Sequence, residues 1–455
     1  MFPALSDGEK ASANMSEPLD ISQQQDNSSL PKDHETGRPH IVIIGGGFAG
    51  IAAVKALRHC EADVTVIDRR NHHIFQPLLY QVATAVLAPA DVAAPIRQLS
   101  ARQKNVSVLL AEVIGVDLGS RSISVKYPGA GDKKITFDYL VVAAGVQSSY
   151  FGHNEFAKYA PCLKTITDAQ IIRSKILSAY ELAESTDDEA ERRRLMTFVL
   201  VGAGPTGVEL AASIAQMAKT TLHANFRRID PAATSIVLLD GAKRVLPSFA
   251  ESSSLKAAQR LAKLGVKVIT GGMVEHIDDQ GVTVGGKRID SGTVLWTAGV
   301  SPSPIVKMLG VATDRAGRAC VGPFLNVADS RGIFVVGDAA TLLQDGRPLP
   351  GVAQVAIQQG RYVGGWIATE IGGGKPPRPF RYFDKGNMAV IGKNFAILES
   401  GRIRLAGIIP WFIWAFIHIM FLPQLQNRRR VQNQWFWSYF TGERSSRLVD
   451  EAPRI

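Results

Sequence analysis

The stretch HIVIIGGGFAGIAAVKAL, residues 40–57, decides the fold of this chain. Four apolar residues, Ile41 to Ile44, predict a short buried strand, and Gly45, Gly47 and Gly50 follow with the spacing GxGxxG before an apolar helical pattern. The first glycine of such a loop permits a tight turn, the second lets backbone approach a pyrophosphate, and the third lets the helix pack on the strand. The segment predicts a strand–turn–helix unit that binds a dinucleotide.

A second strand supports this interpretation. The segment DVTVID, residues 63–68, ends in Asp68. A carboxylate that follows the glycine loop by about 20 residues is placed to bind the hydroxyl groups of a ribose.

The same pattern returns later in the chain. Residues 196–217, MTFVLVGAGPTGVELAASIAQM, supply a strand, then Gly202, Gly204 and Gly207, then a helix. The strand TSIVLLD ends in Asp240, and DYLVVAAGV (138–146) is matched by GTVLWTAGV (292–300). Two copies of one unit predict an α/β fold with two doubly wound sheets and two dinucleotide sites.

Asp240 bears on the choice of nucleotide. A carboxylate at the end of the second strand accepts hydrogen bonds from the ribose diol and repels a 2′-phosphate, which favours NADH over NADPH. Lys243 and Arg244 follow closely. They are either solvated loop residues or cations that weaken this preference.

Composition narrows the chemistry. The 455 residues are 46% hydrophobic and 20% charged, as in a globular protein of two or three domains. The three cysteines, Cys60, Cys162 and Cys320, include no CxxC pair. This spacing argues against a disulfide framework, a metal cluster and dithiol chemistry, and we expect no metal site.

The C-terminal region carries much of the net charge of +10. Residues 405–422, LAGIIPWFIWAFIHIMFL, contain no formal charge and are just long enough to span a bilayer, although Pro410 and His418 argue against it. Residues 401–455 hold eight arginines against three acidic residues, a net +5, and four of the six tryptophans lie between 411 and 437. Arginines and aromatic residues beside an apolar helix predict a segment lying among lipid headgroups rather than a nucleic-acid site. A buried C-terminal helix or a dimer interface is the alternative.

The segment GIFVVGDAAT, residues 332–341, places Gly337 and Asp338 after a further buried strand. With it the chain resembles the flavoproteins that have two dinucleotide-binding domains. The resemblance implies that the first glycine loop binds FAD, that the second binds the nicotinamide nucleotide, and that the chain beyond about residue 320 returns to complete the FAD domain.

A narrower resemblance is to the type II NADH dehydrogenases, single-subunit NADH:quinone oxidoreductases that pump no ions. It covers about residues 39–450 and rests on NHHIFQPLLYQVAT (71–84), VGAGPTGVEL (201–210), VAQVAIQQG (352–360), FDKGNMAVIG (383–392) and the aromatic, basic tail. The pattern AQxAxQ at Ala353 to Gln358 is the most specific of these. The resemblance implies FAD as cofactor and NADH as substrate.

The expected organisation follows from these segments. We expect a disordered tail (1–38), the first part of the FAD domain (39–165), an inserted NADH domain (166–315), the second part of the FAD domain (316–395), and an amphipathic membrane-anchoring helical region (396–455).

The resemblance also implies site residues. For FAD they are Gly45, Gly47, Phe48, Ala49, Gly50, Asp68, Arg69, Val113, Ala144, Gly145, Gly337, Asp338 and Gln354. For NADH they are Gly202, Gly204, Pro205, Thr206, Gly207, Glu209, Asp240, Ala298 and Gly299.

Four residues are expected to act in the reaction. Glu209 orients the nicotinamide, or is an ordinary first-turn glutamate favoured by the helix dipole. Gln354 and Gln358 share one helical face through their i, i+4 spacing and hydrogen-bond near the flavin ring and the quinone. Lys385 balances negative charge on the reduced flavin.

The expected partners are a membrane quinone, the bilayer surface and a second copy of the chain, with no nucleic acid. Because no export signal is evident, we expect peripheral attachment to the cytoplasmic side of the cell inner membrane. Two other functions stay open: a soluble NADH-dependent reductase of a small iron–sulfur protein, and an NADH-sensing flavoprotein that acts through partner binding.

Overall fold

The structure, a computed structural model, describes residues 37–129, 131–327, 330–375 and 377–449. The expected tail, residues 1–38, lies outside this part of the chain except for its last two residues. The chain divides into two units, and residues 38–455 form one of them.

The first sheet has five parallel strands in the order β20-β9-β1-β2-β5. Its strands are β1 (His40–Ile44), β2 (Asp63–Asp68), β5 (Val106–Leu110), β9 (Tyr139–Val142) and β20 (Ile333–Val335). The central strands are mostly apolar because helices and loops cover both faces of the sheet. In the sequence β20 follows the second glycine loop, yet in the structure it completes the first sheet.

The second sheet repeats the arrangement of the first. Its order is β13-β12-β11-β17, and all four strands are parallel: β11 (Thr197–Val201), β12 (Ser235–Asp240), β13 (Val266–Thr270) and β17 (Thr293–Trp296). The first sheet has the equivalent strands in the same order, β5-β2-β1-β9. The predicted α/β fold class with two dinucleotide-binding sheets is confirmed.

Each half also has a three-stranded antiparallel meander between its third and fourth parallel strands, which the glycine motifs did not predict. One consists of β6 (Glu112–Asp117), β7 (Ser122–Lys126) and β8 (Asp132–Thr136). The other consists of β14 (Val274–Asp278), β15 (Gly281–Val284) and β16 (Lys287–Asp290).

The two halves are joined by equivalent strands. β10 (Val146–Ser148) follows the first AAG turn, β18 (Val300–Pro302) follows the TAG turn, and the two pair antiparallel from Val146↔Pro302 to Ser148↔Val300. Gly145 and Gly299 have nearly the same positive φ, +63° and +69°. The turn shared by both sequence copies therefore forms the junction between the two sheets.

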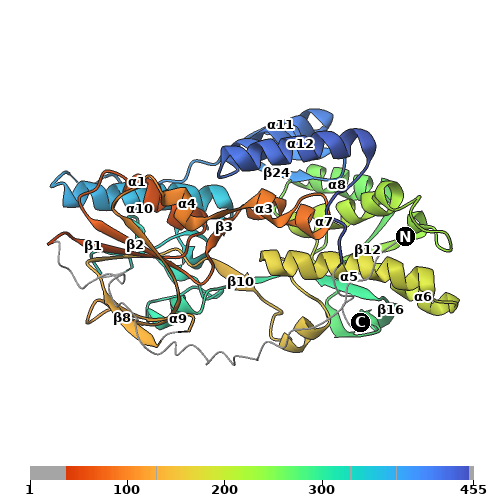
Figure 1. Cartoon of the computed structure of the whole chain (residues 1–455), viewed down its shortest axis with the longest axis horizontal. Helices are drawn as coiled ribbons and strands as arrows, with labels where there is room; N and C mark the ends of the chain where they lie inside the picture. The colour runs from red at the N-terminus through yellow and green to blue at the C-terminus, as the bar shows by residue number, and fades with distance from the viewer. Residues whose placement is uncertain (1–36, 130, 328–329, 376, 450–455) are drawn as a thin grey trace, which may run out of the picture. The chain divides into compact units, whose positions relative to one another are not determined.

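Helix α1 (Phe48–Ala56), which follows the first glycine loop, packs closely on α10 (Ala353–Ile371) (Figure 1). A Cβ on Gly360 would lie 2.0 Å from the Ala49 carbonyl oxygen, and one on Gly364 would lie 2.6 Å from that of Ala53. This close approach brings the start of α10 beside the first glycine loop.

In the second half α7 (Pro205–Gln216) follows the second glycine loop, and α2 (Leu79–Ala83) packs against both α7 and α5 (Ile166–Ser185). The remaining helical elements are η1 (Gln76–Leu78), α3 (Pro89–Val92), α4 (Ile96–Ser100), η2 (Asn154–Lys158), α6 (Glu189–Leu195), η3 (Met217–Thr221), η4 (Pro231–Ala233), α8 (Glu251–Lys263), α9 (Ile305–Met308) and η5 (Gly337–Ala339). Short strands complete the described chain: β3 (His72–Ile74), β4 (Ala93–Pro95), β19 (Ala319–Cys320), β21 (Ala340–Thr341), β22 (Leu343–Gln344) and β23 (Arg347–Pro348).

The C-terminal region begins with strands rather than with a helix. β24 (Asn387–Val390), β25 (Ala396–Ser400) and β26 (Ile403–Gly407) form an antiparallel sheet, followed by α11 (Ile408–Phe421) and α12 (Leu425–Thr441). The start of the apolar run at Leu405 thus belongs to a strand. Helix α11 has 14 residues, about 21 Å at the usual rise, against roughly 30 Å of bilayer hydrocarbon. In the described residues no helix combines the length and the apolar character that crossing a bilayer requires.

Helices α11 and α12 lie side by side, and α12 contacts α3 (Figure 1). Trp414 of α11, Leu422 just after it and Val431 of α12 are buried in the core. After α12 the side chain of Arg444 is buried, and its guanidinium donates to the carbonyl oxygens of Thr84 (2.7 Å) and Ser213 (3.1 Å). The C-terminal region is therefore an integral part of the folded unit.

Candidate active site

The first glycine loop has a tight interior and an open outer side. Gly45 has φ +104°, and a Cβ there would lie 2.4 Å from the Ala143 carbonyl oxygen. A Cβ on Gly50 would lie 1.8 Å from the Gly45 carbonyl oxygen, whereas one on Gly47 meets no atom within 4 Å. Gly45 and Gly50 are thus required by the fold, and Gly47 leaves space for a ligand over the N-terminus of α1.

The second loop repeats this geometry residue by residue. Gly202 has φ +108° and would place a Cβ 2.6 Å from the Ala298 backbone nitrogen. A Cβ on Gly207 would lie 1.8 Å from the Gly202 carbonyl oxygen, whereas one on Gly204 would meet no atom within 4 Å. Both loops fit the pyrophosphate of a dinucleotide.

The acidic residues that end the second strands hold these loops in place. Asp68 accepts hydrogen bonds from the backbone nitrogens of Gly46 (2.7 Å) and Arg70 (2.8 Å). Asp240 accepts from Ala203 (2.5 Å) and Ala242 (2.7 Å). A carboxylate oxygen has a second lone pair, so each group keeps acceptor capacity for a ribose hydroxyl.

The cations after Asp240 differ in their surroundings. Lys243 is exposed, whereas the Arg244 guanidinium donates to the carbonyl oxygens of Pro247 and Phe249. Arg244 is thereby tied to its own loop.

One cavity of about 930 Å³ is lined by residues of both halves and of helix α11. Sixteen predicted site residues line it: Gly45, Gly47, Phe48, Ala49, Asp68, Arg69, Val113, Ala144, Gly145, Pro205, Thr206, Glu209, Gly337, Asp338, Gln354 and Lys385. The structure does not bring to this cavity Gly50, Gly202, Gly204, Gly207, Asp240, Ala298, Gly299 or Gln358. Gly50 lies within the α1 packing, and most of the others belong to the second loop and its neighbouring turn.

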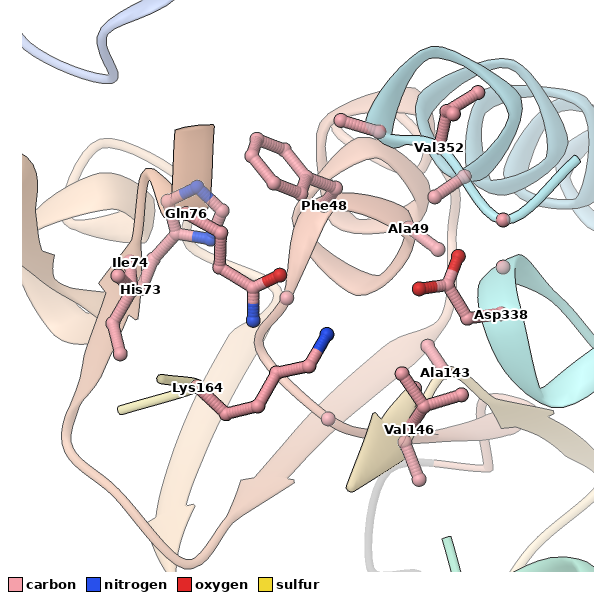
Figure 2. A pocket seen from close by; sticks show the side chains of 18 of the residues that line it. Phe48, Ala49, His73, Ile74, Gln76, Ala143, Val146, Lys164, Asp338 and Val352 are labelled. Carbon is pink, nitrogen blue, oxygen red and sulfur yellow. The ribbon is translucent and has the colours of Figure 1, made fainter. Parts of the chain in front are cut away.

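Two opposite charges face this cavity without contacting each other. Figure 2 shows Lys164 and Gln76 pointing into the same space, with the carboxylate of Asp338 across from them. Within the described residues neither the Lys164 ammonium nor the Asp338 carboxylate makes a hydrogen bond or an ion pair. Burial raises the pKa of Asp338, which the Lys164 charge partly offsets, and burial lowers the pKa of Lys164. Separated charges of this kind fit a ligand that offers both hydroxyl and phosphate groups, as FAD does.

Glu209 lies in the second turn of α7 and faces the cavity. Its Oε1 accepts a hydrogen bond from the Val390 backbone nitrogen at 3.3 Å, and burial raises the pKa of its carboxyl to about 8. The group is therefore mostly protonated at neutral pH and can donate a hydrogen bond as well as accept one.

A buried polar row connects this region to α12. Burial, and next the charge of Glu209, raise the pKa of Tyr80 well above its usual value. The Tyr80 hydroxyl accepts from Gln81 Nε2 (2.9 Å), and Gln81 Oε1 accepts from Trp435 Nε1 (2.6 Å).

The two glutamines of AQxAxQ hold the segment that contains Lys385. Gln354 donates to the Gly386 carbonyl oxygen (2.9 Å) and accepts from the Lys385 backbone nitrogen (3.2 Å). Gln358 makes the equivalent pair with the backbone of Phe383, at 2.9 and 3.0 Å. The shared face of α10 is as predicted, but Gln358 lies one turn further along the helix, under this segment and away from the cavity.

Several lining residues were not predicted. His73 donates a hydrogen bond through Nδ1–H to the Gly46 carbonyl oxygen (3.0 Å) and packs edge-on against Phe48. Other lining residues lie in the motif at 71–84 or in the C-terminal region, where the sequence pattern does not show which side chains face a cavity: His72, Ile74, Phe75, Gln76, Ile417, His418 and Phe421. Lys164, between β10 and α5, also lines the cavity. The signal for Lys164 is its position just before the capping box of α5, formed by Thr165 and Asp168.

The positions of the three cysteines exclude a redox-active cysteine pair at the cavity. All three cysteines are free, and of them Cys162 alone lines the cavity. Cys320 is exposed. A dithiol beside the cofactor is thus not available from this chain.

Comparison with known proteins places the chain in a family. Residues 39–360 match the family described as pyridine nucleotide-disulphide oxidoreductase. The type II NADH:quinone oxidoreductase NdhA of Mycobacterium tuberculosis is 42% identical over 426 residues, covering 91% of this chain and 90% of the relative. The type II NADH:quinone oxidoreductase Ndh of the same organism is 39% identical over 440 residues, covering 94% and 93%.

A solved structure agrees in fold. NDH2 from Plasmodium falciparum, solved in complex with NADH, superposes with a TM-score of 0.82 at 20% identity, covering 90% of this chain and 100% of that one. Together with the two glycine loops and their shared cavity, these matches show that the chain belongs to the pyridine nucleotide-disulphide oxidoreductase family and, within it, to the type II NADH:quinone oxidoreductases.

Proposed function

We propose that this chain oxidises NADH with FAD as its cofactor and reduces a membrane quinone, without pumping ions. One observation carries the proposal: a single cavity is lined by the N-termini of α1 and α7, by the start of α10 and by α11. It therefore connects the loop built for the first dinucleotide, the helix that follows the second loop, and the helix with the most exposed apolar face.

The residues present fit FAD and NADH. We assign FAD to the first loop with Asp68, Gly337, Asp338 and Lys164, and NADH to the second loop with Asp240, Ala298 and Gly299. When bound, FAD accepts a hydride from NADH and passes two electrons to the quinone. The protein supplies position and electrostatics.

The chain's own groups divide this work. Glu209, protonated at neutral pH, presents a hydrogen-bond donor between the α7 end of the cavity and β24. Lys385 presents an ammonium at the same cavity, and Gln354 fixes the backbone on both sides of it. We propose that Glu209 orients the nicotinamide and that Lys385 balances negative charge delivered to the site.

The exposed face of the C-terminal helices is assigned to a lipid surface. On it Phe412 and Phe416 are 59% and 66% exposed, and Phe436 and Phe440 are 67% and 70% exposed. Exposed arginines flank this face: Arg402, Arg404, Arg429 and Arg430. An apolar face with basic flanks suits anionic headgroups, so we propose peripheral attachment at the cytoplasmic side of the inner membrane. A homodimer through this face is the competing arrangement.

The two other functions receive less support. The relatives at 39–42% identity are quinone oxidoreductases by name. Neither reduction of an iron–sulfur protein nor NADH sensing explains why the cavity is lined by α11, a helix whose outer face is apolar.

The test is NADH oxidation by the full-length, FAD-loaded protein with ubiquinone-1, with NADPH as the control nucleotide. We expect fast turnover with NADH and a much lower kcat/KM with NADPH because of Asp240. The full chain is required, since the tail carries buried contacts such as those of Arg444. Rapid flavin reduction by NADH with no quinone-dependent reoxidation would overturn the proposal and point to a protein acceptor.

A further inference from the structure

Helix α11 has two different faces. Its outer face is exposed at Ile409, Phe412, Phe416 and Met420. Its inner face lines the cavity at Ile417, His418 and Phe421, and Phe421, 47% exposed, lies at the border of the two. A hydrophobic substrate arriving along the outer face would meet His418 as the polar side chain of the helix that faces the cavity.

The proton on the His418 ring is placed by a hydrogen bond. Nδ1 lies 2.7 Å from the carbonyl oxygen of Trp414, and a carbonyl oxygen can only accept, so Nδ1 carries the hydrogen. Burial lowers the pKa of His418 to about 4, which keeps the ring neutral at pH 7. In a neutral ring with the proton on Nδ1, Nε2 carries a lone pair and is an acceptor.

The ring is also held in orientation. Trp414 lies against it with a centroid distance of 4.4 Å, and Phe75 meets it edge-on at 6.0 Å. In the part of the chain that the structure describes, no hydrogen-bond donor reaches Nε2. The acceptor is thus fixed in place and free for a ligand in the cavity.

We propose that Nε2 of His418 accepts a hydrogen bond from a hydroxyl of the bound quinol, an inference that rests on the proposed quinone reductase function. A quinone presents carbonyl oxygens, which are acceptors only and gain nothing from this atom. A quinol presents O–H donors at the same positions. His418 therefore recognises the reduced form of the head-group.

Lys385 offers a second polar contact in the same cavity. Its ammonium lies 5.9 Å from the ring of Phe421, which is three residues from His418 and so on the same side of α11. An ammonium can donate a hydrogen bond to the carbonyl oxygen of the quinone and to the hydroxyl oxygen of the quinol. The pair thus offers one contact common to quinone and quinol and one specific to quinol, and a group that binds the reduced form more tightly also favours its formation in the site.

The experiment compares two substitutions at His418 in the FAD-loaded full chain. His418→Phe keeps a ring and removes the acceptor, and the Trp414 carbonyl keeps the helical hydrogen bond from the backbone. His418→Gln restores an oxygen near the Nε2 position. The probes are ubiquinone-1 and ubiquinol-1, measured as KM for the quinone, as product-inhibition constant for the quinol, and as quinol binding by calorimetry.

We expect His418→Phe to weaken quinol binding about two- to tenfold, the range of one neutral hydrogen bond, with a smaller change in KM for quinone. His418→Gln should recover most of the quinol affinity. Equal weakening of quinone and quinol, or no recovery with glutamine, would show that the ring only shapes the pocket and would overturn the inference. Failure of the wild-type protein to reduce ubiquinone-1 would instead overturn the proposed function, so the two failures are distinguishable.

Discussion

Glu209 is the carboxyl group whose surroundings in the cavity most favour its neutral form. Its folded-state pKa of about 8 lies above the ordinary 4.5. A raised carboxyl pKa means that the folded state holds the proton more tightly than the unfolded state. The stability from this group is full below about pH 4.5 and is lost as the pH rises through about 8.

Glu209→Gln should therefore change the pH dependence of stability. The amide stays neutral at every pH, so the free energy of unfolding should fall less between about pH 5 and pH 9 in the variant than in the wild type. Urea unfolding of the FAD-loaded protein at several pH values measures this. Glu251→Gln, at an exposed position in the first turn of α8, is the control, and parallel curves for Glu209→Gln and wild type would contradict the raised pKa.

At the residue scale the sequence predicted geometry better than roles. The glycines of both loops were identified from their GxGxxG spacing. Gly45, Gly50, Gly202 and Gly207 leave no room for a Cβ, whereas Gly47 and Gly204 leave space for a ligand. Lys164, His73 and His418 were missed because nothing in the local sequence tells a cavity-facing histidine or lysine from an ordinary one. Lys164 and His73 interact with Asp338 and Gly46, which are distant in the sequence. His418 contacts Trp414 because the two lie one helical turn apart.

At the scale of elements, the contact between α1 and α10 is the closest helix packing near the site. Gly360 allows it because a Cβ there would lie 2.0 Å from the Ala49 carbonyl oxygen, while Gly365 on the same helix has open space.

Gly360→Ala should push α10 from α1 and cost about 1–3 kcal/mol or more in the free energy of unfolding. Gly365→Ala should be neutral or stabilise by about 0.5–1 kcal/mol through helix propensity. Urea midpoints and FAD retention on gel filtration measure both effects. Equal stability of the two variants would be inconsistent with the close approach.

Some secondary-structure elements could be predicted from the sequence pattern and others could not. Strand order in both sheets follows from the duplicated motif, because each copy repeats one folding unit. The two meanders and β24–β26 were not predicted, since short antiparallel strands are stabilised by cross-strand contacts rather than by a periodicity of their own. For the same reason Leu405 to Gly407 were read as part of the apolar helix, although they pair with β25.

At the scale of the whole molecule, Arg444 ties the tail to the body of the protein. Burial lowers its pKa only to about 10, so it stays charged at neutral pH. Its guanidinium donates to the backbone carbonyl oxygens of Thr84, at the end of α2, and of Ser213 in α7.

Arg444→Met should destabilise the protein by about 2–4 kcal/mol because it removes both buried hydrogen bonds. Arg447→Met, which breaks a partly exposed ion pair with Glu443 (3.0 Å), should cost less than about 1 kcal/mol. Thermal unfolding of the two variants separates these costs. Equal shifts would mean that the buried contacts of Arg444 contribute little.

The outer face of the C-terminal helices makes a second prediction at this scale. Phe412→Ser with Phe416→Ser should weaken binding to vesicles of phosphatidylglycerol and phosphatidylethanolamine about tenfold or more, because each exposed phenyl group contributes roughly 1.5–3 kcal/mol when it enters lipid. Flotation of the protein with vesicles measures the bound fraction. Leu343→Ser, at a position 66% exposed on β22, is the control. A change in oligomeric state without loss of vesicle binding would assign this face to a second copy of the chain instead.

The two faces of α11 determine which quinone concentration sets the rate of the enzyme. With the outer face of α11 in lipid, as we propose, this helix borders both the cavity and the lipid, and a quinone can pass between them without entering water. The quantity that governs the rate is then the number of quinones per lipid, not the number per litre. Adding inert lipid at constant total quinone should slow the enzyme by surface dilution, while adding buffer should leave it unchanged.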